Sequence, residues 1–375
     1  MNLAELIEEK RIIVCCGAGG VGKTTTSAAL ALAAARRGRR ALVLTIDPAK
    51  RLAQAMGLPP TGQDPVQIDR TKLARASVEL PQSGELWAWM LDAQVVLDRV
   101  VERFAPSEEA KARIRETRLF HALREVIAGL QEYTAAEALF DFESQGRFDL
   151  IVLDTPPSRN ALDFLDAPRR LTRFLDERTL AIFAPDVQEK ASALVRAAAR
   201  IVSTAIAKAF SESFAIELQQ FLGAFGTLFG KMRIHADGVR ELLSSNRSAF
   251  LVVTSTEPTA VDEALFFKRR VAELGLTTEG FVLNRSYAIG AGLVHPREAL
   301  DRATDPVARS ALSKLAPMAD LELRRAAVDR GILEKLVAEG VRDRGKGAVA
   351  LPYLDQSVED LAALALLSRY ILTAV

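Results

Sequence analysis

A glycine-rich segment near the start of the chain carries the residue types needed to bind phosphate. Residues 17–24 read GAGGVGKT, so Lys23 and Thr24 follow directly after a glycine. In this pattern the backbone N–H groups of the loop surround anionic oxygens, the lysine contacts the outer phosphates, and the neighbouring hydroxyl binds Mg²⁺. A glycine-rich turn without a ligand is the alternative, and the match at all eight positions argues against it. The residues expected to hold the phosphates are Gly19, Gly20, Val21, Gly22, Lys23, Thr24 and Thr25.

The sequence on both sides of this loop predicts the elements that must position it. Residues 12–16 (IIVCC) form a short apolar run typical of a buried strand, and residues 25–35 are rich in alanine and leucine, which predicts a helix. The unpaired N–H groups at a helix N-terminus favour an anion. A second apolar run at residues 41–46 completes a βαβ unit, so we expect a parallel sheet in an α/β fold.

Two acidic residues follow predicted strands. Asp47 comes after residues 41–46, and Asp154 ends the apolar run that begins at Phe148. Ligands of open α/β sheets bind at the carboxyl ends of the strands, where Asp47 could orient an attacking water and Asp154 could hold Mg²⁺. An aspartate at this position also caps helices, and Asp47 followed by Pro48 fits that role equally well. The phosphate loop upstream favours the metal-binding role for Asp154.

Two blocks of helical pattern interrupt the strands. Residues 83–142 read as amphipathic helices, and a second block covers residues 166–244. Strand patterns return at residues 250–254, 280–284 and 348–353, with helices predicted between and after them. We therefore expect a mostly parallel sheet flanked by helices, with an inserted all-helical subdomain. The α/β domain would comprise residues 1–60, 145–165 and 248–375, and the insertion residues 61–144 and 166–247.

An aromatic stripe stands out in the second helical block. Apolar residues recur at spacings of three and four, which places them on one face of a helix. The stripe consists of Phe210, Phe214, Leu218, Phe221, Phe225 and Phe229. Such a face is more often part of a core, but three glycines between residues 223 and 230 weaken this helix, and a pliable apolar segment would suit a groove for an apolar partner. The sequence leaves both interpretations open.

The composition excludes several classes of protein. The 375 residues carry a net charge of +1, so no overall basic character suggests a nucleic-acid partner. The two cysteines, Cys15 and Cys16, are adjacent and build no disulfide framework, which favours a reducing, cytoplasmic compartment. The three histidines are too scattered for a metal site. No run of 18 apolar residues predicts a membrane-spanning helix, and residues 1–11 lack a signal-peptide core.

Several motifs together resemble one family of ATPases. They are the phosphate loop with Thr24 and Thr25, the segment TIDPA at residues 45–49, the segment DTPP at residues 154–157 with residues 164–165 downstream, and the strand ending in Asn284. In this order they look like the ArsA-type family of arsenical-pump and tail-anchored-protein targeting ATPases, a branch of the deviant phosphate-loop ATPases. The resemblance covers essentially the whole chain.

The resemblance implies roles for individual residues. It implies an ATP- and Mg²⁺-dependent dimer, formed with a second copy or a paralogue, that closes on nucleotide and opens after hydrolysis. Lys23 and Asp47 would act in catalysis, while Thr24, Asp47 and Asp154 would hold the magnesium ion. Asn284 would contact the adenine, and the turn at Pro352 would lie against the same base.

The chain also departs from the family pattern. The family's loop carries a lysine at its second position that reaches the partner's phosphates, whereas this chain has Ala18. Either Lys50, Arg51 or Arg159 substitutes for that cation, or hydrolysis is slow, or a different chain completes the site. The metalloid-binding cysteines of the arsenite pumps and the zinc-binding cysteines of the targeting ATPases are missing as well, so activation by a metalloid is not expected.

These features favour a Mg²⁺-dependent ATPase that acts as a nucleotide-controlled dimeric switch and binds hydrophobic client segments through its helical subdomain. Two alternatives remain open at this point. The first is a nucleotide-dependent scaffold for a specific protein partner, in which the stripe belongs to the core. The second is the ATPase subunit of an anion pump.

Overall fold

The computed structural model divides the chain into two compact units. The described residues are 1–45, 64–91, 107–116, 130–156, 238–289, 295–342, 346–355 and 360–373, with the single positions 56, 98, 101, 102 and 105. The first unit comprises Met1–Met90, Gly146–Ala161 and Leu243–Val375, and the second comprises Leu91–Gln145 and Leu162–Leu242.

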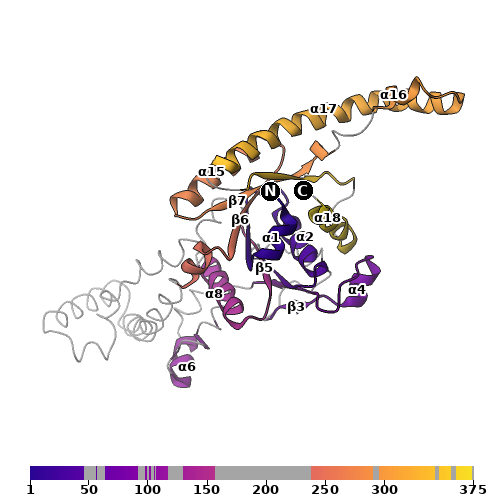
Figure 1. The fold of residues 1–375 in the computed structure, drawn as a ribbon. Coiled ribbons are helices and arrows are strands. Elements are labelled where there is room, and N and C mark those ends of the chain that lie inside the picture. The colour runs from indigo at the N-terminus through magenta and orange to yellow at the C-terminus, as the bar shows by residue number, and fades with distance from the viewer. Residues whose placement is uncertain are drawn as a thin grey trace. The chain divides into compact units, whose positions relative to one another are not determined.

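The described part of the first unit is built around an eight-stranded sheet (Figure 1). Its strands are β1 (Ile12–Cys16), β2 (Arg40–Thr45), β3 (Val66–Gln67), β4 (Glu85–Met90), β5 (Leu150–Asp154), β6 (Ser248–Thr254), β7 (Thr278–Ser286) and β8 (Ala348–Pro352). The spatial order is β3-β4-β2-β5-β1-β6-β7-β8, and only the β3–β4 pair is antiparallel. The predicted α/β class with a mostly parallel sheet is confirmed.

Helices cover both faces of this sheet. α1 (Leu3–Glu9), α2 (Lys23–Arg36) and α18 (Leu361–Thr373) share one core with the sheet residues below them. α15 (Pro258–Glu273) and α17 (Pro306–Arg342) pack on β6, β7 and β8 (Figure 1). Right-handed crossovers explain the division, because the chain moves in opposite directions across the sheet from β1 to β2 and from β6 to β7. With both faces covered, the central strands β1, β5 and β6 are buried along their full length.

The helix α2 lies close to the sheet because its side chains are small. Its sequence is KTTTSAALALAAAR, and every residue from Thr26 to Ala35 is buried. Arg37 and Gly38 follow its last turn, and Gly38 adopts a left-handed conformation with φ of 83°. The chain can therefore reverse at once into β2, which starts at Arg40.

The structure corrects the prediction of helices from residue 83 onward. Residues 85–90 form β4, which pairs in parallel with β2 from Glu85 opposite Arg40 to Met90 opposite Thr45. Leu86 and Ala88 are buried and alternate with the more exposed Glu85 and Trp87, which is the period of two of a strand and not the helical period that the sequence predicted. Residues 64–90, predicted as part of the helical insertion, belong to the unit that contains the sheet.

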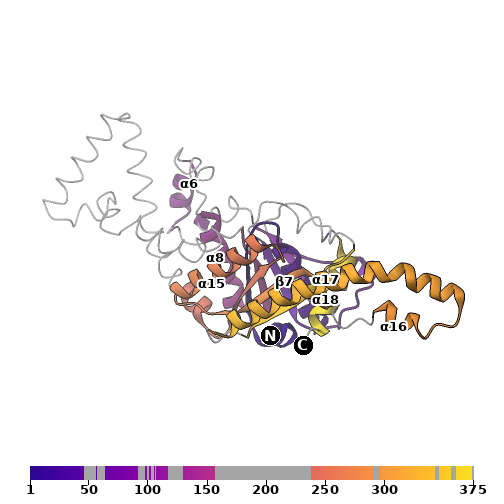
Figure 2. The same cartoon turned by 90° about the horizontal axis from the view of Figure 1, so that it is seen from above.

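The remaining elements in the described residues are the helices α4, α6, α8 and α16. In the first unit they are α4 (Arg70–Arg75) and α16 (Pro296–Leu300), which packs against α17 (Figures 1 and 2). His295 and Arg297 at the start of α16 both contact Asp320 of α17, at 3.1 and 2.6 Å. The second unit contains α6 (Glu108–Glu116) and α8 (Leu130–Gln145). The aromatic stripe at residues 210–229 lies outside the described residues.

None of the helices in the described part of the chain combines the length and the hydrophobicity that crossing a membrane would require.

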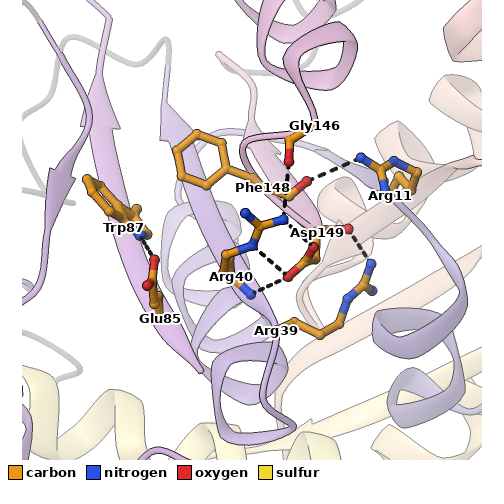
Figure 3. Close-up of polar contacts among 8 residues, drawn as sticks. All are labelled: Arg11, Arg39, Arg40, Glu85, Trp87, Gly146, Phe148 and Asp149. Atoms are coloured by element: carbon orange, nitrogen blue, oxygen red, sulfur yellow. Dashed lines mark hydrogen bonds and ion pairs between the residues drawn. The ribbon is translucent and has the colours of Figure 1, made fainter. Parts of the chain in front are cut away.

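Arginines at the starts of β1 and β2, the two strands beside β5, hold the start of β5 (Figure 3). Arg40 donates to the Asp149 carboxylate through Nε and Nη2, at 3.1 and 2.8 Å, and to the Gly146 carbonyl. Arg39 donates to the Asp149 carbonyl, and Arg11 donates to the Phe148 carbonyl. The segment that enters β5 is therefore held at several points, and β5 carries Asp154 at its other end.

The Arg40–Asp149 contact makes a pH-dependent contribution to stability. Hydrogen bonds from Arg40 hold the pKa of Asp149 below its ordinary value of 3.8, so the contact stabilises the folded state above that pH and is lost as the pH falls through the lowered pKa. We expect Asp149→Asn to lower the free energy of unfolding by about 1–2 kcal/mol at pH 7, and by progressively less below pH ~4, in urea titrations followed by circular dichroism.

The matched control is Glu273→Gln, which removes an acid from an exposed ion pair with Arg270. Such pairs contribute little, so this variant should follow the wild type at every pH. A difference between wild type and Asp149→Asn that is constant from pH 7 to pH 3 would contradict the assignment.

Candidate functional site

The glycine-rich loop joins the end of β1 to the start of α2 at the carboxyl edge of the sheet. Gly20 and Gly22 have φ of 79° and 91°, a left-handed conformation that glycine adopts without strain. Gly22 is the N-cap of α2, and no side chain caps this helix. A helix N-terminus without a side-chain cap, reached through such a loop, suits an anionic ligand.

Close backbone packing requires two of the loop glycines. A Cβ atom on Gly17 would lie 2.0 Å from the Val253 carbonyl oxygen of β6. A Cβ atom on Gly22 would lie 2.1 Å from Nδ2 of Asn284, which donates a hydrogen bond of 2.9 Å to the Val21 carbonyl. Asn284 is buried near the end of β7, so the loop is held against two neighbouring strands.

Lys23 turns back over the loop. Its Nζ donates to the Ala18 carbonyl oxygen at 2.8 Å, and its side chain is buried. The ammonium group is thus held inside the ring of loop residues, where an anion bound by the loop would meet it. Ala18 itself is only 7% exposed, so the position that carries lysine in the family pattern is packed into the protein here.

Asp154 receives hydrogen bonds from two threonines on different elements. Its Oδ2 accepts from Oγ1 of Thr24 at 2.7 Å and from Oγ1 of Thr45 at 2.9 Å. Thr24 lies in the first turn of α2, and Thr45 is the last residue of β2. Asp154 is fully buried, and the two hydroxyl donors offset part of the cost of placing a carboxylate there.

These donors fit a magnesium ion. A threonine hydroxyl has one proton, and Thr24 gives it to Asp154, so the lone pairs of its oxygen are left for a metal. Hydroxyl and carboxylate oxygens are the hard ligands that Mg²⁺ prefers. The glycine cradle, the lysine ammonium and this oxygen pair therefore form a site suited to a phosphate–magnesium ligand.

Cys15 and Cys16 take no part in this set. Burial raises the pKa of the Cys15 thiol to about 12 and that of Cys16 well above its usual value, so both stay protonated. Both side chains lie in the core, and the Cys15 carbonyl accepts hydrogen bonds from the backbone N–H and the hydroxyl of Thr155. The loop after Asp154 is thereby attached to the end of β1.

The structure brings together many, but not all, of the residues singled out from the sequence. The loop residues 19–25, Asp154 and Asn284 lie at one edge of the sheet, and Pro352 is in register with Ser286, two residues after Asn284. Asp47, Lys50, Arg51 and Arg159 lie outside the described residues.

Sequence reasoning missed the contact between Thr45 and Asp154. The two residues are paired in register on adjacent strands. The signal was available, because residues 41–46 and the run from Phe148 to Asp154 were both predicted as strands, with Thr45 and Asp154 at or near their carboxyl ends. What the sequence lacked was the strand order, which makes β2 and β5 neighbours.

Comparison with known proteins identifies the family. The model of the anion-transporting ATPases matches residues 10–289, from the start of β1 to beyond the end of β7. The chain belongs to this family. It is therefore a nucleotide-binding ATPase of the ArsA kind, as the sequence motifs predicted. A search of curated proteins finds no match.

The contact between Gly22 and Asn284 makes the geometry of the loop testable. Gly22→Ala should destabilise the protein by more than Gly275→Ala. Both glycines are left-handed, with φ of 91° and 75°, so both variants carry about 1–2 kcal/mol of backbone strain, but only the Cβ at position 22 meets another atom within 4 Å. Thermal unfolding of the two variants measures the difference.

A double variant isolates the contact with Asn284. Removing the amide in Gly22→Ala/Asn284→Ala should recover part of the extra loss, so the two effects should not add. Equal destabilisation by Gly22→Ala and Gly275→Ala would show that Asn284 does not press on the loop.

Proposed function

We propose that this chain hydrolyses ATP with Mg²⁺ and uses the state of the bound nucleotide as a switch. The observation that carries the proposal is the pairing of Thr24, in the first turn after the phosphate loop, with Asp154, at the end of a neighbouring strand. A hydroxyl that donates to a buried carboxylate and keeps its lone pairs free is the arrangement by which a phosphate-loop enzyme holds its metal.

The residues of the loop would hold the phosphates. Backbone groups of Gly19, Gly20, Val21 and Gly22 would surround the phosphate oxygens, with Lys23, Thr24 and Thr25 at the start of α2 beside them. Lys23 would neutralise charge that develops on the transferred group, and Thr24 with Asp154 would hold the magnesium ion, which supplies further charge neutralisation when bound. Catalysis of this kind relies on positioning rather than on covalent chemistry.

The role of Asp47 in this proposal comes from the sequence. In the sequence it comes two positions after Thr45, the last residue of β2. A carboxylate there would orient the attacking water and complete the ligands of the metal.

Asn284 has the chemistry to recognise adenine. Its Nδ2 carries two protons, and one of them is donated to the Val21 carbonyl. The amide oxygen and the second proton together form the donor–acceptor pair that an asparagine offers to adenine. Pro352, on the neighbouring strand end, is in register with Ser286 and would lie against the same base.

The connectivity of the two units supports a switch. The chain passes from the carboxyl end of β4 directly into the second unit at Leu91, and from the loop after Asp154 into the same unit at Leu162. A change at Thr155 and Pro156 would therefore be passed along the chain to the second unit. Thr155, attached to the Cys15 carbonyl, is the first residue of that loop.

The partners in this proposal follow from the resemblance and the sequence pattern. The active form would be a cytoplasmic dimer, either of two copies or with a paralogue, and the aromatic stripe at residues 210–229 would bind hydrophobic segments of client proteins. The family's description as anion-transporting supports a second candidate, the ATPase subunit of an anion pump. With only Cys15 and Cys16 in the chain, both buried, its anion would not be one that thiolates capture.

Nucleotide binding and hydrolysis test the first part of the proposal. Lys23→Ala should abolish ATP hydrolysis and weaken ATP binding at least tenfold, because it removes the cation next to the phosphates. Asp154→Asn should retain nucleotide binding in EDTA but lose the increase that Mg²⁺ produces. Phosphate release measures hydrolysis, and isothermal titration calorimetry with ATP, with and without Mg²⁺, measures binding and its dependence on the metal.

The control for these variants is Lys314→Ala, which removes an exposed lysine of α17. It should bind and hydrolyse ATP as the wild type does. Wild-type protein whose affinity for ATP does not respond to Mg²⁺ would overturn the proposal.

A separate prediction concerns Ala18. If hydrolysis is slow because the family's lysine is missing, Ala18→Lys should raise turnover by at least tenfold, and the gain should increase with protein concentration because the lysine acts on the partner's phosphates. Steady-state phosphate release at several protein concentrations measures this. Unchanged turnover would mean that the missing lysine does not limit the enzyme.

A further inference from the structure

We infer that Thr45 is a positioning residue for the magnesium site, through its hydrogen bond to Asp154. The inference rests on the proposed function, since it concerns the same metal. It adds a residue that neither the phosphate loop nor the sequence motifs assign to the site.

The position of Thr45 is set by the sheet. Thr45 is in register with Asp154 on the adjacent strand, and Asp154 is in register with Cys15 on the next one. Residues in register on parallel strands point to the same face, so Thr45 and Asp154 both lie on the face of α2. Thr45 is 2% exposed, and its hydroxyl donates to Oδ2 of Asp154 at 2.9 Å.

The two hydroxyl donors come from different elements. Thr24 approaches Oδ2 from α2, and Thr45 approaches it from β2. With one donor, the carboxylate could turn part of the way about its last bond and still keep that hydrogen bond. A second donor, fixed by the backbone pairing of β2 with β5, removes this freedom. Thr45 therefore fixes the direction in which the shared carboxylate oxygen faces Thr24.

This orientation matters to the metal through Thr24. The hydrogen bond to Asp154 fixes where the Thr24 proton points and therefore where its oxygen presents the lone pairs that can bind Mg²⁺. Outer-shell groups that orient metal ligands in this way change metal affinity about 10–100-fold when they are removed. Loss of the Thr45 hydroxyl should act on Mg²⁺ and leave the contacts between the loop and the phosphates in place.

The experiment compares Thr45→Val with Thr45→Ser. Valine keeps the shape of threonine without the hydroxyl, and serine keeps the hydroxyl. We measure binding of a fluorescent ATP analogue while titrating Mg²⁺, and binding of the same analogue in EDTA. Thr45→Val should raise the half-saturating Mg²⁺ concentration about 10-fold or more while leaving affinity in EDTA within about threefold of wild type. Thr45→Ser should restore the wild-type Mg²⁺ dependence.

A matched control is Thr254→Val. Thr254 is a fully buried threonine at the carboxyl end of β6, and its hydroxyl contacts the Ser255 carbonyl instead of Asp154. This variant should retain the wild-type dependence on Mg²⁺. Thermal unfolding shows whether Thr45→Val is folded. If it is not, Thr45→Ala replaces it, because alanine also lacks the hydroxyl.

Three results would overturn the inference. They are an unchanged Mg²⁺ dependence in the valine and alanine variants, an equal loss of affinity with and without Mg²⁺, and the same Mg²⁺ shift in Thr254→Val. A different result marks the failure of the proposed function itself, namely wild-type protein that binds the analogue equally well with and without Mg²⁺.

Discussion

A carboxylate buried beneath the phosphate loop is the constraint on which the rest of this site depends. Asp154 is inaccessible to solvent, and a charge in that position is tolerated only where hydrogen-bond donors surround it. Thr24 and Thr45 supply two donors, from a helix and from a neighbouring strand. The carboxylate therefore joins the end of β5, the end of β2 and the first turn of α2. A metal ion bound to the Thr24 oxygen would therefore be connected to all three elements through Asp154.

The sheet makes this convergence possible. Parallel strands bring their carboxyl ends to one edge of the sheet, so residues that are more than 100 positions apart in the chain meet there. Thr45 and Asp154 are such a pair. The opposite edge is held by a different set of contacts, in which Arg11, Arg39 and Arg40 bind the start of β5. One end of β5 is thus fixed by arginines, and the other carries the group that would respond to the ligand.

This chain belongs to the anion-transporting ATPases but has an alanine, Ala18, where the family pattern has a lysine. The loop keeps the glycines, lysine and threonine of a phosphate site, but the position that would reach a partner's phosphates is a packed alanine. The geometry within one chain is therefore suited to holding a nucleotide. In the proposed reaction, the charge that develops on the transferred phosphoryl group has to be neutralised, and an alanine at position 18 does not contribute to this.

The sequence by itself determined the loop, the parallel sheet and the family. Glycine spacing, apolar runs and the alternation of strands and helices are local patterns that can be recognised without knowing the fold. It also indicated Asp154, since an acid at the end of a strand is recognisable. Tertiary structure alone decided that residues 85–90 are a strand and that Thr45 contacts Asp154. Both depend on which strands are neighbours. The side-chain pattern of β4 fits a helix as well as a strand, so its pairing with β2 decides its conformation.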